Sequence, residues 1–256
     1  MSSDFFHGLM RWDIERGGTV RRLPYCYRDC LTFAMVVTAA TSGVRRLIPH
    51  PHLHPVEVMP GRCLAAFAAF EYRQTDDDPY NELSMSFLVT HGTRPSRPLL
   101  PLARMLRSRT TQSYVWQLPV TTEHARAGGV DLFGYPKSLA AIDISAGSSR
   151  VECALSADGQ RLLRMDGPVL PTRLGRPLRY LTYAVEGDSL VSAGVLVNPI
   201  EIAESWVRSG ASIEVGTRHP VCKALSEIGL GRAPLLYRYV PRCEAILFPA
   251  RNVRDV

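Results

Sequence analysis

Hydrophobic and polar residues alternate along several stretches of the chain, as expected for strands that bury one face. In Leu83–Thr90, one face carries Leu83, Met85 and Phe87, and the other carries Ser84, Ser86 and Leu88. Asp158-Gly159 and Glu186-Gly187-Asp188 each separate two such stretches and predict hairpin turns. The expected strands are Leu31–Thr38, Cys63–Tyr72, Leu83–Thr90, Tyr114–Leu118, Leu139–Ser145, Val151–Leu155, Arg161–Met165, Arg179–Val185, Leu190–Leu196, Leu235–Tyr239 and Glu244–Phe248, the last two as a strand pair.

Helical patterns are short and few. Four are expected, at Thr41–Leu47, Thr121–Arg126, Ile202–Val207 and Val221–Ile228, and the second should end near Gly128-Gly129. The stretches 92–101 and 168–177, rich in Pro, Gly and Ser, are expected to be loops. These patterns predict a mainly β (α+β) protein, an antiparallel barrel or stacked sheets with a few peripheral helices. A length of 256 residues and the lack of a clear linker suit a single domain over 1–256.

Composition and charge limit the cellular location and the classes of partner that the sequence predicts. Hydrophobic residues make up 46% and charged residues 21% of the sequence, and no apolar run approaches the ~18 residues that span a bilayer. The stretch Met1–His7 lacks the pattern of a signal peptide, so a cytoplasmic location without membrane contact is expected. The net charge is +6, but the arginines are scattered and accompany no nucleic-acid motif. We therefore expect no nucleic-acid partner.

Metal and cofactor sites are not indicated. The six cysteines form no CxxC pair and are expected to be free thiols. His50, His52 and His54 alternate and could place three imidazoles on one side, yet the intervening prolines favour a stiff surface connection. GxGxxG, P-loop and HExxH patterns are also missing from the sequence, so no cofactor is predicted.

Lysine is rare in this chain, with only Lys137 and Lys223 among its thirty basic residues. Arginine stays charged at any biological pH, whereas a lysine can lose its proton and act as a nucleophilic amine. Lys137 ends the segment Phe133–Lys137 (FGYPK), where Gly134 permits a bend and the proline stiffens the chain before an apolar strand. Burial there would favour a neutral amine able to form a Schiff base. The alternative is a structural lysine whose ammonium reaches the solvent.

Two further groups of residues carry candidate chemistry. Tyr80 and Glu82 lie two apart at the start of a strand and therefore share a face, where they could move protons near a carbonyl. Arg28 precedes the strand at Leu31 and could hold a substrate carboxylate. Without other support, Glu82 could equally be a solvated acid and Arg28 a structural ion-pair partner, for instance of Asp29.

Taken together, these segments resemble the acetoacetate decarboxylase superfamily over roughly residues 20–250. The central signature is carried by 118–123, 129–132 and 134–140, and the supporting matches are 27–29, 44–49 and 80–82, all in the same order. The resemblance implies a β-barrel-like fold, assembly into homo-oligomers, and a Schiff-base lysine in an apolar cavity. In acetoacetate decarboxylase the nucleophile is a lysine activated by desolvation or by a nearby cation.

By position, the resemblance makes Lys137 the nucleophile, with Glu82 and Tyr80 completing the catalytic set. Arg28 would meet the substrate carboxylate at the cavity, and Phe133 and Tyr135 would contact the substrate. The chain also departs from the family pattern, which identifies it as a divergent member. Ser138 replaces a second lysine, and Phe67 occupies the place of a second carboxylate, with Glu71 the nearest acid. These differences suit a larger or different oxo acid as substrate.

The leading hypothesis is therefore a cofactor-independent decarboxylase that acts on an oxo acid through an imine at Lys137. One alternative is a pyruvate aldolase-dehydratase that uses the same lysine. The other is a ligand-binding barrel without catalysis, which the loss of the second lysine and second carboxylate would explain.

Overall fold

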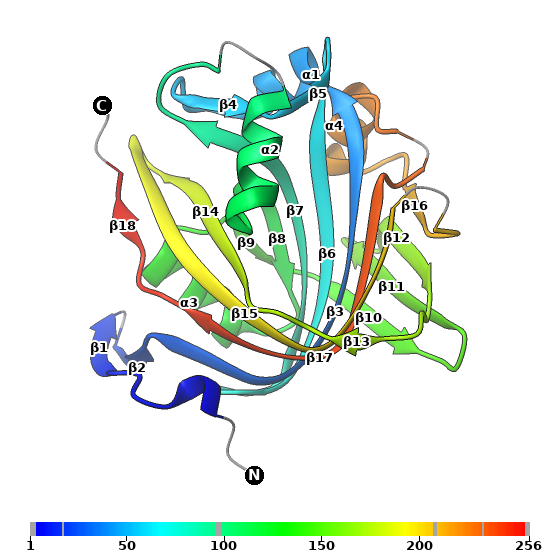
Figure 1. Ribbon diagram of the computed structural model, residues 1–256. Helices are drawn as coiled ribbons and strands as arrows, with labels where there is room; N and C mark the ends of the chain where they lie inside the picture. Colours follow the sequence, from blue (N-terminus) through cyan, green and yellow to red (C-terminus); the bar gives the residue numbers. More distant parts are fainter. Residues whose placement is uncertain (1–3, 17, 96–98, 207–208, 232, 254–256) are drawn as a thin grey trace.

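The structure, a computed structural model, describes residues 4–16, 18–95, 99–206, 209–231 and 233–253. Its centre is a closed barrel. The barrel strands are β3 (Tyr25–Ala40), β6 (Arg62–Thr75), β7 (Tyr80–His91), β8 (Thr110–Val120), β14 (Leu178–Glu186), β15 (Ser189–Trp206) and β17 (Leu236–Leu247). The order β7-β6-β3-β17-β15-β14-β8 closes because β8 also pairs with β7 (Figure 1). Neighbouring barrel strands are antiparallel except β8 and β14, which confirms the predicted mainly β fold with a barrel.

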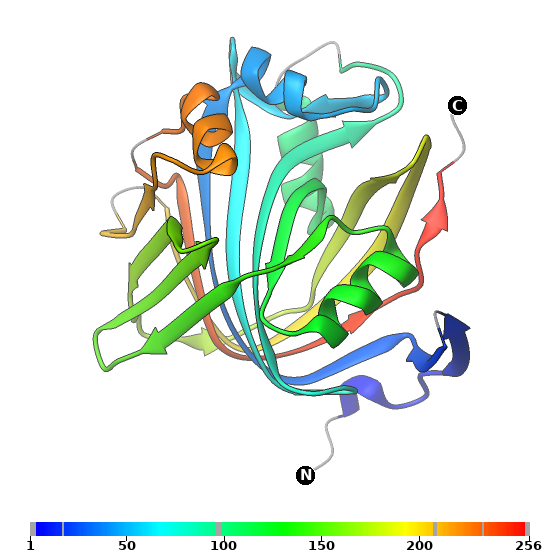
Figure 2. The same cartoon turned by 180° about the vertical axis from the view of Figure 1, so that it is seen from behind.

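Smaller elements surround the barrel. The strands outside it are β1 (Trp12–Arg16), β2 (Thr19–Leu23), β4 (Leu53–Pro55), β5 (Glu57–Met59), β9 (Lys137–Leu139), β10 (Ala141–Ala146), β11 (Arg150–Ala157), β12 (Gln160–Pro168), β13 (Arg173–Leu174), β16 (Ser212–Val215) and β18 (Arg251–Asn252). The helices are η1 (Asp4–Phe6), α1 (Thr41–Leu47), α2 (Leu99–Ser108), α3 (Glu123–Phe133) and α4 (Pro220–Glu227). Strands β10, β11, β12 and β16 form a second sheet, and α3 lies along the barrel wall (Figure 2). None of the described helices has the length and apolar character needed to cross a bilayer.

The main core lies outside the barrel lumen, between the barrel wall and the elements that cover it. On β6, Phe67 and Ala69 are almost fully buried in this outer core, whereas Ala66 and Ala68 face the lumen. Successive side chains of a strand point to opposite faces, so one strand serves both the core and the cavity. This double use explains why the stretch 63–70 is apolar throughout.

Two sequence predictions of secondary structure were wrong. The expected strand pair near the end of the chain is one strand, β17, which bulges around Pro241. Proline has no N–H for the ladder, so it marks the bulge rather than a turn. The expected helix Ile202–Val207 is a continuation of β15 as far as Trp206, and Val207 lies outside the described residues. Pairing with β17 stabilises this segment as a strand despite its short helix-like pattern.

Two helices also differ from expectation. Helix α2 occupies Leu99–Ser108, where the sequence suggested a loop up to Pro101. Helix α3 does not end near Gly128-Gly129 but continues to Phe133. Both helices supply walls of the cavity described next.

Candidate active site

The barrel encloses a cavity of about 680 Å³. Its walls come from the barrel strands together with α2, α3 and β9. The structure brings Lys137, Glu82, Tyr80, Phe133 and Tyr135 together at this cavity. A concave, mostly apolar pocket with a few convergent polar groups is the usual form of a small-molecule site.

Lys137 is positioned by the turn that ends α3. Gly134 takes a left-handed conformation (φ 62°, ψ 20°), and its N–H closes the helix by donating to the carbonyls of Gly129 and Val130. The chain then enters β9, which runs parallel to β8 with Lys137 opposite Leu118. The Lys137 side chain is only 6% exposed and points into the barrel.

Gly129 makes room for this lysine. A Cβ atom at position 129 would lie 2.2 Å from Cδ and 2.4 Å from Cε of Lys137, far inside contact distance. A glycine in a helix interior costs roughly 0.5–1 kcal/mol relative to alanine. The helix therefore continues through Gly129, at that cost, so that the lysine stem can lie against its backbone.

Glu82 is the direct partner of Lys137. The Lys137 Nζ atom lies 2.8 Å from Glu82 Oε2, and the carboxylate side chain is 8% exposed. Taking two charges out of water is costly, so a buried pair of this kind is held by its mutual contact and by further hydrogen bonds.

Three buried tyrosines surround this pair. Tyr72 donates a hydrogen bond to Glu82 Oε1 (3.3 Å), and the hydroxyls of Tyr27 and Tyr80 lie 3.3 Å apart. The Tyr27 and Tyr72 rings stack with centroids 4.3 Å apart, and Lys137 Nζ lies 5.2 Å from the centroid of the Tyr80 ring. Burial raises the pKa of all three phenols well above 10.0, and the nearby charge of Glu82 raises the pKa further. They remain protonated hydrogen-bond donors at neutral pH.

The raised pKa values of these phenols predict that the folded protein loses stability in alkali. Their pKa is higher in the folded than in the unfolded protein, so their contribution is complete below pH 10.0 and is lost as the pH rises above it. Each phenol adds a slope of up to about 1.4 kcal/mol per pH unit in that window. Urea unfolding on either side of pH 10 measures it.

Buried thiols start the loss of stability at a lower pH, because an unfolded thiol ionises near pH 9.0. Burial raises the pKa of Cys63 from 9.0 to about 11 and that of Cys153 to about 12. The variant Tyr72→Phe separates the two contributions. It should flatten the decline above pH 10 and leave the part near pH 9 unchanged. A decline above pH 10 equally steep in Tyr72→Phe and in the original protein would contradict this account.

Phe133 and Tyr135 form the wall beside the lysine. Their rings stack with centroids 5.6 Å apart, and the Tyr135 hydroxyl lies 2.6 Å from Thr182 Oγ1 on β14. This contact ties the turn before β9 to β14, which pairs with the same strand β8. It fixes the direction from which Lys137 enters the cavity.

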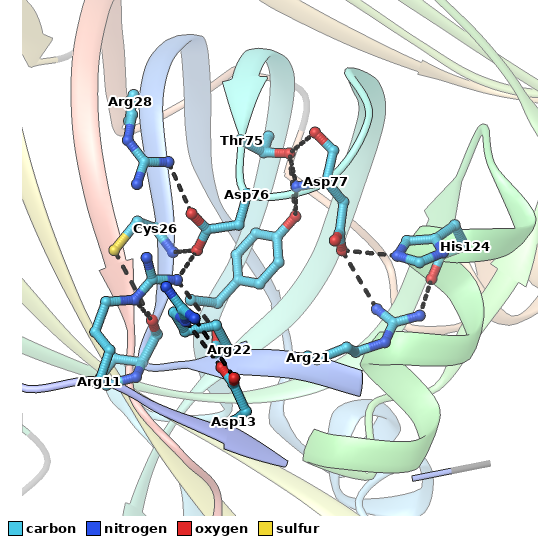
Figure 3. A network of polar contacts seen from close by, with 12 residues as sticks. Arg11, Asp13, Arg21, Arg22, Cys26, Arg28, Thr75, Asp76, Asp77 and His124 are labelled. Atoms are coloured by element: carbon cyan, nitrogen blue, oxygen red, sulfur yellow. Dashed lines mark hydrogen bonds and ion pairs between the residues drawn. The ribbon is translucent and has the colours of Figure 1, made fainter. Parts of the chain in front are cut away.

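Arg28 lies away from the lining of the cavity. Its Nη1 donates to Asp76 Oδ1 (2.7 Å), and Arg11 pairs with the same carboxylate (Figure 3). Arg21 is the arginine that reaches the cavity on this side of the barrel. Its guanidinium contacts Asp77 (3.4 Å) and the carbonyl of His124 (3.0 Å), as Figure 3 also shows.

Arg21 and Lys137 rest on consecutive glycines of α3. A Cβ atom at Gly128 would lie 1.9 Å from Arg21 Nη1, just as one at Gly129 would meet the Lys137 stem. The sequence expected a helix end at these glycines. Their close contacts show that they accommodate two cavity-lining side chains instead.

The positions that depart from the family pattern lie outside the cavity. Phe67 is 1% exposed within the outer core, and Glu71 pairs with Arg73 at the surface (2.7 Å). Ser138 is exposed on β9, where alternation points it away from Lys137. Near the lysine, the inward face of β6 carries Phe70 and Tyr72 rather than an acid.

Sequence reasoning missed several polar residues of the cavity. Tyr72 belongs to the site through the strand register, in which it lies opposite Tyr80. On another wall, Arg238 contacts Glu204 (2.7 Å) and donates to the Tyr180 hydroxyl (2.7 Å). Such pairings join residues far apart in the chain, and no local pattern indicates them.

The described residues contain no cluster of three or more His, Cys, Asp or Glu side chains suited to a metal ion. All six cysteines are free and buried. The rings of His50 and His52 lie 5.7 Å apart near the surface connection that the prolines suggested.

Comparisons with known proteins agree with this architecture. Among solved structures, an acetoacetate decarboxylase is similar with a TM-score of 0.66 and 17% identity, covering 92% of this chain and 91% of that one. An acetoacetate decarboxylase from Legionella pneumophila has a TM-score of 0.64 and 12% identity, covering 91% and 88%. The enduracididine biosynthesis enzyme MppR, complexed with pyruvate, has a TM-score of 0.61 and 14% identity, covering 91% of each chain.

At this level of identity the similar structures establish the fold alone. No curated protein sequence matches the chain. The sequence profile of the family described as acetoacetate decarboxylase (ADC) matches residues 16–181, which is more than half of the chain and includes Lys137, Glu82 and the turn between α3 and β9. The chain therefore belongs to the acetoacetate decarboxylase family.

Proposed function

We propose that this protein is an imine-forming carboxy-lyase that decarboxylates a 3-oxo acid at Lys137. The observation that carries the proposal is the Lys137 amine, 6% exposed at the cavity and 2.8 Å from Glu82. A nucleophilic lysine needs a site that lets it lose its proton, and a carboxylate in direct contact can accept that proton. The other lysine, Lys223, is exposed on α4 and lies outside the site.

The reaction follows from these groups. Glu82 takes the proton of Lys137, whose Nζ attacks the ketone carbon, and water leaves as the imine forms. Protonation of the imine draws electrons from the bond to the carboxylate carbon, which breaks to release carbon dioxide and leave an enamine. Glu82 or Tyr80 returns a proton to carbon, and water then releases the ketone and the free amine. Burial raises the pKa of Tyr80, which keeps its phenol protonated and able to donate a hydrogen bond.

We further propose that Arg21, rather than Arg28, orients the substrate carboxylate. Arg28 would have to leave Asp76 and move into the cavity, whereas Arg21 already lines it beside the helix turn that carries Gly129. A guanidinium can bind a carboxylate through two parallel hydrogen bonds. Phe133 and Tyr135 would exclude water around the imine.

A second function uses the same imine for aldol condensation and dehydration of pyruvate with an aldehyde. The observation in its favour is that the similar MppR structure is complexed with pyruvate. A single carboxylate beside the lysine, with phenols as proton donors, also suits an enamine that attacks an aldehyde. Neither route needs a group beyond the chain and its substrates.

Borohydride trapping tests both functions. We expect acetoacetate or pyruvate, with borohydride, to add a stable mass to Lys137, located by peptide mass spectrometry. Lys223 is the internal control and should stay unlabelled. Carbon dioxide released from acetoacetate identifies the lyase, and a conjugated chromophore from pyruvate and an aromatic aldehyde identifies the aldolase-dehydratase. No adduct with pyruvate or with 3-oxo acids of any chain length would contradict both functions and leave a ligand-binding barrel.

A further inference from the structure

The cavity extends well beyond the lysine. Glu82 and Leu88 both line it and lie on the same strand, β7, six positions apart. A strand advances about 3.3 Å per residue, so these two side chains mark a path of about 20 Å along the barrel. Lys137 lies at the Glu82 end of this path.

Small side chains line the path between the two ends. Ala34 on β3, Ala66 and Ala68 on β6, and Ser84 and Ser86 on β7 all face the cavity. The register places them in adjoining rows, with Ala68 opposite both Ala34 and Ser84, and Ala66 opposite Ser86. Because none of them is larger than serine, this wall of the barrel leaves the lumen open from one end to the other.

The far end lies against α2 and is mostly apolar, with Ser113 opposite Leu88 in the register. We call it the α2 chamber, defined by the lining residues Val36, Val58, Leu64, Leu88, Leu102 and Met105. Leu106 and Trp206 also line the cavity and are 57% and 58% exposed. The cavity therefore reaches the surface past apolar side chains, which suits the passage of an apolar group.

A small oxo acid leaves most of this space unused. Pyruvate has about six non-hydrogen atoms, and at no more than ~30 Å³ each they occupy at most ~180 Å³. The cavity measures about 680 Å³. Empty apolar volume on this scale is a site for apolar ligand groups.

We propose that the α2 chamber binds the apolar tail of the substrate, an unbranched alkyl chain or an aryl-alkyl group of similar length. This inference rests on the proposed function for the position of the carbonyl, which lies at Lys137 while the tail runs along β6 and β7. An alkyl chain advances about 1.3 Å per carbon, given a C–C bond of about 1.5 Å. A chain of about ten carbons therefore spans about 13 Å and reaches the level of Ser86. At that level Val36, which lies opposite Ala66 in the register, begins the chamber.

The row of small residues becomes polar at β17, where Arg238 lies opposite Ala34 in the register, and this difference fixes the course of the tail. Arg238 and Glu204 form an ion pair there, and Arg238 also donates to Tyr180. An apolar chain placed against them would keep water from these charges without replacing it by hydrogen bonds. The alanine and serine rows on β6 and β7 carry no charge, so the tail lies against them.

Binding of saturated carboxylates tests the chamber separately from imine chemistry, because hexanoate and decanoate have no ketone. We expect calorimetry to show decanoate binding at least tenfold more tightly than hexanoate. Each buried methylene strengthens binding by up to about fourfold, which corresponds to ~0.8 kcal/mol. Equal affinities would overturn the proposal. If decanoate binds tightly but no 3-oxo acid of any length is trapped on Lys137, the proposed function fails and the chamber stands.

Variants locate the tail. Ala66→Phe should block the path and remove the preference for decanoate, while hexanoate still binds as before. Leu102→Ala, which preserves the path, should weaken decanoate several-fold. The matched control is Leu99→Ala on the same helix, at a side chain 58% exposed and outside the cavity lining, which should leave both affinities unchanged. Circular dichroism and melting temperature establish that each variant folds. A preference for decanoate that survives in folded Ala66→Phe, or in Leu102→Ala at full strength, overturns the proposal.

Discussion

Replacing Lys137 by arginine should abolish carbon dioxide release from a 3-oxo acid. Arginine keeps the positive charge next to Glu82, so the buried ion pair and the fold survive. Its guanidinium does not deprotonate at biological pH and cannot form the imine. Removing a covalent nucleophile reduces kcat by a factor on the order of 10⁴ or more. The measurement is carbon dioxide release together with borohydride labelling, at a melting temperature close to that of the original protein.

The chain offers a matched control in its other lysine. Lys223→Arg makes the same substitution on an exposed face of α4 and should leave turnover unchanged. Glu82→Gln gives a different pattern, since it keeps Lys137 but removes the group that accepts and returns protons. It should slow turnover and still allow some labelling. Full turnover in Lys137→Arg would refute both proposed reactions.

The lysine motif was predictable because its signals are local. A bend glycine, a proline and a lysine before an apolar strand occupy a few consecutive residues of the sequence. Tyr80 and Glu82 share a face through simple alternation, and the structure brings both to the cavity. The predicted barrel is confirmed for the same reason, since most of its strands carry their own pattern of apolar residues.

The rest of the cavity depends on pairings between distant segments. Tyr72 reaches Glu82 because β6 and β7 pair in one register, and a shift of one residue would turn it outward. The sequence predicted Arg28 before a core strand as a carboxylate-binding residue, whereas the structure places it within β3, where it pairs with Asp76. Helix α2 follows a loop-like stretch and carries Pro101 near its start. Its sequence alone therefore did not predict a helix, and its apolar face is recognised only from its packing against the barrel.

Gly128 and Gly129 show where a rule based on local sequence fails, at the candidate active site. Two adjacent glycines usually indicate the end of a helix, because they lower its stability. Here α3 continues past them, and each glycine accommodates a different side chain of the cavity. The departure from propensity therefore coincides with the candidate active site, as expected where function and local stability compete.

Gly129→Ala should nearly eliminate imine formation without altering any chemical group of the site. Ordinary contact begins at 3.4 Å, and the new Cβ would lie 2.2 Å from Lys137 Cδ, so the lysine stem must move by at least 3.4 − 2.2 = 1.2 Å. A misplacement of about 1 Å can cost on the order of 10²-fold in rate. We expect that loss in the rate of borohydride labelling at Lys137 and in turnover.

The neighbouring substitution separates displacement of the lysine from a general effect on α3. Gly128→Ala gives the helix the same alanine, but its Cβ would meet the guanidinium end of Arg21, 1.9 Å from Nη1, and not Lys137. The tip of a long side chain can swing aside, so labelling of Lys137 should persist while KM for the oxo acid rises. Both alanines favour the helix intrinsically by about 1 kcal/mol, so unfolding of α3 is not the expected cause. Equal loss of labelling in the two variants would mean that α3 positions the turn as a whole, and full activity in Gly129→Ala would mean that the lysine acts from another position.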